Sequence, residues 1–83
     1  MKREKFISWL LDNGCLVIRN ANSGYTIIRN VINGKISGVP VNDPLKPATI
    51  CRICLTLEIN KVPEEAKAAE EIIAFAHKAH RST

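Results

Sequence analysis

The sequence predicts an α+β protein, a two-layer sandwich in which two helices cover one face of a three-stranded antiparallel sheet. Within residues 1–61, apolar side chains recur at helical spacing near both ends, and three runs rich in β-branched residues lie between them. Short connections containing Asn, Ser and Gly separate these runs, so a meander is the simplest topology. With 83 residues the chain is long enough for one domain and too short for a barrel or a doubly wound sheet.

The first helix is predicted over residues 2–13, where the apolar side chains fall on one face: Phe6, Ile7, Leu10 and Leu11. Trp9 lies next to this face, and its spacing favours packing in the core over a role in binding a partner. Gly14 is expected to end the helix, because glycine adopts the left-handed conformation without a Cβ penalty.

Three strands are predicted next, over residues 15–20, 25–32 and 35–41. A turn at residues 22–24 is expected to join the first two strands. Asn33-Gly34 predicts a two-residue type I′ hairpin, in which both residues have a positive φ. Pro40 cannot donate a ladder hydrogen bond, so the third strand is expected to be an edge strand or to end there.

A second helix is predicted from Pro47 to about residues 59–60, because proline is favoured in the first turn of a helix. Its core-facing side chains are spaced at i, i+3, i+4 and i+7: Ile50, Ile53, Cys54 and Leu57. A third helix, richer in alanine and acidic residues, is predicted from Pro63 through residue 80. We therefore divide the chain into a body, residues 1–61, and an appended helical segment, residues 62–83.

Positive charge is concentrated in the body. Residues 1–61 carry nine Lys and Arg against four Asp and Glu, whereas residues 62–83 carry three against four. This distribution favours a polyanionic partner, most simply nucleic acid, and a solvated basic surface is the plainer alternative. Aromatic residues make up only 5% of the chain, which favours backbone and groove contact with a nucleic acid over base stacking. Seven cations, here called the basic set, are the candidates for phosphate contact: Lys2, Arg3, Lys5, Arg19, Arg29, Lys35 and Lys46.

The cysteines and histidines do not form a recognisable chemical site. Cys51 and Cys54 make a Cys-x-x-Cys pair on a predicted helix, and only Cys15, His77 and His80 are left to complete a zinc site. We interpret the cysteines as small core residues and the histidines as solvated residues near a helix end. The sequence therefore predicts no metal site and no cofactor.

We expect a cytoplasmic protein that does not enter a membrane. The number of cysteines is odd, three, which favours a reducing compartment. No apolar run approaches the roughly 20 residues that a membrane-spanning helix needs. The basic N-terminus is not followed by the apolar segment of a signal peptide.

Several motifs of the body occur in a recognisable order. Residues 3–14 (REKFISWLLDNG) form a helix with a glycine stop, and residues 17–23 form a strand with its turn. Residues 39–41 (VPV) and 45–53 (LKPATICRI) form a Val-Pro strand and the opening of a helix. Together these stretches resemble the HicA (YcfA-like) family of small toxins from bacterial toxin–antitoxin systems. The resemblance implies an α-β-β-β-α fold like that of double-stranded-RNA-binding domains, here with an extra C-terminal helix.

The resemblance also implies an mRNA endoribonuclease, with RNA as substrate and a cognate antitoxin protein as a further partner. The family places its catalytic histidine in a Gly-Ser-His-His run just after the first turn, whereas this chain has Asn22-Ser23-Gly24-Tyr25. The histidine would fall on Gly24, beside Tyr25, and neither residue is an effective general base at neutral pH.

We therefore predict a HicA-like RNA-binding protein, a degenerate endoribonuclease toxin that contacts the RNA backbone through the basic set. One alternative is an active endoribonuclease with a relocated base, His77 or His80. The other alternative is a protein-interaction module, in which the appended helix binds a partner or a second copy through Ile72, Ile73 and Phe75. The sequence predicts neither the oligomeric state nor a preferred RNA sequence.

Overall fold

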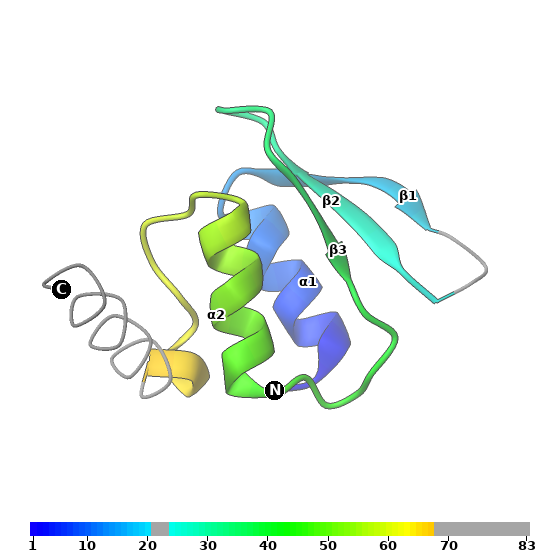
Figure 1. Cartoon of the computed structure of the whole chain (residues 1–83), viewed down its shortest axis with the longest axis vertical. Helices are drawn as coiled ribbons and strands as arrows, with labels where there is room; N and C mark the ends of the chain where they lie inside the picture. Colours follow the sequence, from blue (N-terminus) through cyan, green and yellow to red (C-terminus); the bar gives the residue numbers. More distant parts are fainter. Residues whose placement is uncertain (21–23, 68–83) are drawn as a thin grey trace, which may run out of the picture.

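The computed structural model describes residues 1–20 and 24–67 and shows an α+β fold with two layers. The helices α1 (Arg3–Asp12) and α2 (Pro47–Thr56) lie side by side against one face of a sheet (Figure 1). The sheet has three strands, β1 (Cys15–Asn20), β2 (Thr26–Asn30) and β3 (Ile36–Val39). A short 3-10 helix, η1 (Glu64–Ala66), follows α2 and packs against it. The predicted α+β class is thus confirmed.

The sheet is an antiparallel meander in the order β1-β2-β3, as the short connections predicted. The pairing register shifts between Val17 and Arg19, so a β-bulge interrupts β1 and Arg19 pairs with Ile27. Pro40 follows the last residue of β3, which agrees with the predicted end of this strand. Both β1 and β3 are edge strands of the sheet.

The core lies between the sheet and the two helices. Trp9 is partly buried against it and stacks on Phe6, with the ring centroids 6.1 Å apart, which confirms its predicted place in the core. The predicted apolar face of α1 is correct only in part, since Leu11 is 44% exposed. All four predicted positions of α2 are buried. Every helix and strand, the loop before α2 and the residue that ends α2 contribute fully buried side chains: Phe6, Leu10, Cys15, Ile28, Val39, Leu45, Ile50, Cys51, Cys54 and Leu57.

The connection between β2 and β3 differs from the predicted type I′ turn. β2 ends at Asn30, earlier than predicted, and the Asn30 N–H donates to the Lys35 carbonyl at 2.9 Å across a loop of residues 31–34. Gly34 has a φ of +76°, but Asn33 does not adopt a positive φ. Instead, Asn33 Oδ1 accepts a hydrogen bond from the Lys35 N–H at 2.8 Å. This side-chain bond takes the place of the predicted turn geometry.

The helix α2 ends at Thr56, also earlier than predicted. Glu58 adopts a φ of +55°, which stops the helix. The N–H groups of Glu58 and Ile59 donate to the carbonyls of Leu55 (3.1 Å) and Cys54 (3.0 Å), respectively. These two bonds form a Schellman motif, with a glutamate in the position that usually holds glycine.

Of the appended segment, residues 62–67 belong to the described part of the chain. The predicted helix opening at Pro63 corresponds to η1, while the rest of the predicted third helix lies outside the described residues, as does most of the predicted turn at residues 22–24. Ala66 is buried, and its carbonyl accepts a hydrogen bond from Cys51 Sγ at 3.3 Å. The beginning of the appended segment is therefore packed against the body.

Candidate nucleic-acid interface

The guanidinium of Arg3 is hydrogen-bonded within the protein and joins α1 to the sheet. Its Nε donates to the Pro40 carbonyl at 2.7 Å, and its Nη2 donates to Thr26 Oγ1. The Thr26 hydroxyl in turn donates to Asn20 Oδ1 at 3.1 Å. These bonds tie the first turn of α1 to the ends of the three strands. Because the guanidinium is held within the fold, we remove Arg3 from the residues proposed to contact RNA.

Lys5 already has a carboxylate partner. Its Nζ lies 3.0 Å from Glu65 Oε1, which connects α1 to η1. The hydrogen bond from Lys5 holds the pKa of Glu65 below its usual range. The Lys5 and Glu65 side chains are 66% and 47% exposed, so the pair is screened by solvent and contributes little to stability. Lys5 therefore remains a candidate for phosphate contact.

Lys2 and Lys46 lie next to the N-terminal ends of the two helices. Each is the residue before its helix, and neither makes a side-chain capping hydrogen bond. The Leu45 N–H donates to the Met1 carbonyl at 2.8 Å, which brings the two helix entrances together. Helix N-termini carry partial positive charge, so these two lysines extend a surface that favours anions.

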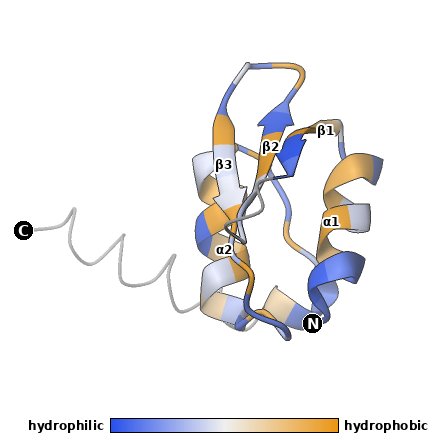
Figure 2. Ribbon diagram, turned by 90° about the vertical axis from the view of Figure 1, so that its right-hand side faces the viewer, coloured by the Kyte–Doolittle hydropathy of each residue, from blue (hydrophilic) through white to orange (hydrophobic). Residues whose placement is uncertain are grey.

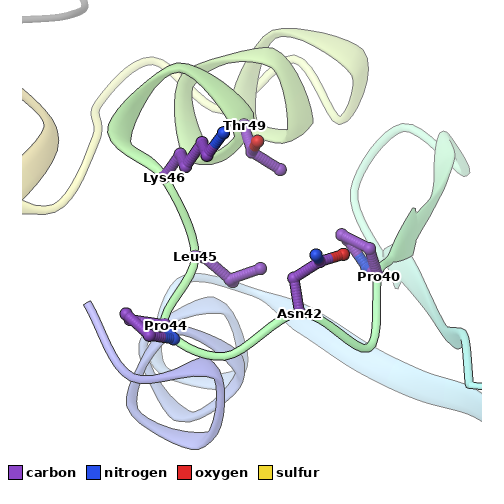
Figure 3. Close-up of a pocket in the computed structure, with 6 residues that line it drawn as sticks. All are labelled: Pro40, Asn42, Pro44, Leu45, Lys46 and Thr49. Carbon is purple, nitrogen blue, oxygen red and sulfur yellow. The ribbon is translucent and has the colours of Figure 1, made fainter.

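A pocket of about 190 Å³ lies beside Lys46, between the loop that follows β3 and the first turn of α2 (Figure 3). Lys46 is the sole charged side chain among its six lining residues. No carboxylate or imidazole lines this pocket, so it offers no pair of groups for acid–base chemistry. The lining residues are Pro40, Asn42, Pro44, Leu45, Lys46 and Thr49.

Arg19 and Arg29 lie on the face of the sheet that points away from the helices. In the sheet register Arg29 is opposite both Leu16 and Ile36, and Arg19 is opposite Ile27. Side chains directly opposite each other share a face, so the two arginines are diagonal neighbours. In Figure 2, hydrophobic residues (orange) occur in the strands as well as in the helices. We call this surface the outer sheet face: Leu16, Arg19, Tyr25, Ile27, Arg29 and Ile36.

All charged side chains of the outer sheet face and the adjoining hairpin are positive. Arg19, Arg29 and Lys35 fall between residues 15 and 42, a stretch with no Asp or Glu. All three cations are exposed. Among residues 1–20 and 24–67, no carboxylate lies within ion-pair distance of them. As far as the described residues go, the surface can attract an anionic partner without first breaking an ion pair.

Gly24, where the HicA resemblance would place a catalytic histidine, cannot readily hold one. Gly24 has a φ of +102°, and a Cβ there would lie 3.1 Å from Val41 Cβ. A histidine at this position would therefore be strained by both its backbone and its neighbour. Tyr25 is 54% exposed, and its ring lies over Gly38, with Cδ1 3.2 Å from the place of a Cβ on that glycine. The alternative bases His77 and His80 lie outside the described residues.

The three cysteines are buried, which confirms their interpretation as small core residues. Burial raises the pKa of the Cys15 thiol. Within the described part of the chain, no three His, Cys, Asp or Glu side chains gather as metal ligands would. The same residues contain no helix that is long and apolar enough to cross a membrane.

One feature of this surface was missed by sequence reasoning. Arg3 bonds to residues 23, 37 and 40 positions away, and no local pattern indicates such contacts. The open outer sheet face, by contrast, agrees with the expectation that both helices cover a single face of the sheet.

No family model, curated protein or solved structure matches this chain. The family resemblance therefore rests on the sequence motifs alone.

Proposed function

We propose that this chain is a HicA-like RNA-binding protein of the toxin–antitoxin type, with a fold related to double-stranded-RNA-binding domains. The observation that carries the proposal is the exposed cluster of Arg19, Arg29 and Lys35, in a stretch that has no carboxylate. The order of helices and strands agrees with the α-β-β-β-α arrangement that the resemblance implies. Lys2 and Lys46 extend the positive surface at the helix ends.

The chemistry of such a surface is phosphate binding. Lysine and arginine side chains neutralise phosphates and release condensed counterions, so affinity falls as the salt concentration rises. Contacts of this kind position the RNA but do not read its sequence. The protein should therefore bind structured RNAs of different sequence with similar affinity.

The proposed protein is a degenerate endoribonuclease. Cleavage of RNA by the family's route needs a base that removes the proton of a 2′-hydroxyl group. Gly24 has no side chain, and Tyr25 is a phenol, so neither residue supplies that base. The fold and the basic surface can hold RNA without this group.

Fluorescence anisotropy with a labelled RNA hairpin, measured over a salt series, tests RNA binding. We expect binding at low salt, and a double variant Arg19→Ala/Arg29→Ala that binds more weakly. Its slope of log K against log salt should be shallower by about one for each lost phosphate contact. Lys61→Ala, at an exposed residue outside the basic set, is the matched control. Absence of binding at low salt would overturn the proposal, as would affinity unchanged by the double variant.

Incubation of the same RNA with the protein tests the loss of cleavage. We expect no product from the natural chain. Cleavage that is abolished by His77→Ala or His80→Ala would instead establish the active endoribonuclease with a relocated base.

A further inference from the structure

The outer sheet face exposes an unusually apolar surface for the face of a folded domain. Leu16 is 59% exposed, and Tyr25 and Ile36 are each 54% exposed. Both helices cover the opposite face of the sheet, and within residues 1–20 and 24–67 nothing covers this one. Contiguous exposed apolar surface of this kind marks a site of interaction.

The charges on the outer sheet face restrict what can cover it. Arg19 and Arg29 stand among the apolar side chains, and no acidic residue is present to balance them. Two copies of this face packed against each other would bring arginines together, which is unfavourable. The complementary surface must therefore supply carboxylates beside apolar side chains.

The chain itself contains one segment with this composition. Residues 70–75 read EEIIAF, so two glutamates are followed at once by Ile72, Ile73 and Phe75. Adjacent carboxylates occur elsewhere only at Glu64-Glu65, and Glu65 is paired with Lys5. Residues 70–75 lie outside the described residues, so we select them for their sequence alone.

The reach of the chain decides which copy supplies the segment. η1 packs against α2, and Ala66 is hydrogen-bonded to Cys51 of that helix, on the helical side of the molecule (Figure 1). The three residues from Lys67 to Glu70 span at most about 10 Å when fully extended. A helix with its side chains is already about 10 Å across, and the outer sheet face lies beyond both layers. We therefore infer that the carboxylates dock on a second copy and do not cross both layers to reach Arg19 and Arg29 of their own chain.

We propose that residues 70–75 of one chain dock on the outer sheet face of a second copy, and that two chains exchange these segments to form a dimer. Glu70 and Glu71 pair with Arg19 and Arg29, and the apolar side chains cover Leu16, Ile27 and Ile36. When each chain places its segment on the other, both outer sheet faces are covered, and the assembly stops at two chains. The docked segment occupies the arginines proposed to contact RNA, so the dimer and the RNA complex compete.

Analytical ultracentrifugation of the full chain without RNA, over a range of protein concentrations, tests this inference. We expect a concentration-dependent dimer, which Ile73→Asp weakens at least about tenfold. The double variant Arg19→Glu/Arg29→Glu should also weaken it, and adding Glu70→Arg/Glu71→Arg should restore it by exchanging the charges. Leu55→Asp is the matched control, because Leu55 is 62% exposed on α2, away from the sheet. Circular dichroism checks that each variant is folded.

A chain that stays monomeric at every concentration would overturn the proposal. So would a dimer that Ile73→Asp and the arginine substitutions leave unchanged. Since RNA is absent from the measurement, the dimer can be established even if the RNA proposal fails, and the reverse also holds.

Discussion

Glu58 has an unfavourable backbone conformation that the fold requires at the end of α2. Its φ of +55° makes it the only non-glycine residue with a positive φ in the part of the chain that the structure describes. A side chain in this conformation costs about 1 to 2 kcal/mol, because the Cβ approaches the following carbonyl. The Schellman hydrogen bonds from the Glu58 and Ile59 N–H groups hold the turn nevertheless.

Glu58→Gly should therefore stabilise the protein. We expect the free energy of unfolding to rise by about 1 kcal/mol, as measured by urea denaturation. Glu58→Ala is the control, because it removes the same carboxylate but keeps the strained Cβ, and it should give no such gain. Equal effects of the two substitutions would show that the backbone conformation is not the cause.

Asn30 connects two elements that lie apart in the sequence. It is only 5% exposed, and its Nδ2 donates to the Leu57 carbonyl at the end of α2 at 2.8 Å. Its Oδ1 accepts from the Ile32 N–H at 3.0 Å, which begins the loop between β2 and β3. One buried amide thus joins the hairpin to the second helix and ends β2.

Asn30→Ala should destabilise the protein by about 1 to 3 kcal/mol, because buried hydrogen-bonding groups lose their partner. Thermal unfolding monitored by circular dichroism measures the change. Asn33→Ala is the comparison, since exposed Asn33 also donates to the Leu57 carbonyl, at 3.1 Å, and solvent can replace its bond. If the two variants were equally stable, the burial of the Asn30 amide would not matter to the fold.

The molecule as a whole is held by its core and not by covalent links. Cys15, Cys51 and Cys54 form no disulfide bond, and each is buried in the layer between the sheet and the helices or beneath η1. Burial raises the pKa of Cys15, so its reactive thiolate forms at higher pH than that of an ordinary thiol. Access to these thiols therefore reports the opening of the whole core.

We expect the native protein to react slowly with a thiol reagent such as DTNB and to react fully once it is unfolded in urea. Because the pKa of Cys15 is raised, its native reaction should level off at a higher pH than the reaction of an exposed thiol. Ser8→Cys places a thiol at an exposed position of α1 and should react at once. Prompt labelling of Cys51 or Cys54 in the native chain would contradict their core role and favour a redox or metal function for the pair.

Local pattern predicted the elements well and their ends less well. The run of residues 15–20 gave the bounds of β1, and the spacing of apolar residues on α2 selected side chains that are all buried. The turn after Asn30 and the early end of α2 were predicted wrongly. Both depend on hydrogen bonds of Asn33 and Glu58, which propensity does not describe.

The sequence by itself determined the α+β class, the strand order, the excess of positive charge and the absence of a histidine before residue 77. These properties follow from periodicity, composition and short connections, which are local. Only the tertiary structure decided that Arg3 joins α1 to the strand ends, that Arg19 and Arg29 share an open apolar face, and that a side chain at Gly24 would be strained by its positive φ and a tight contact with Val41. Each of these depends on contacts between residues that are distant in the chain, which strand pairing and the packing of the helices on the sheet bring together.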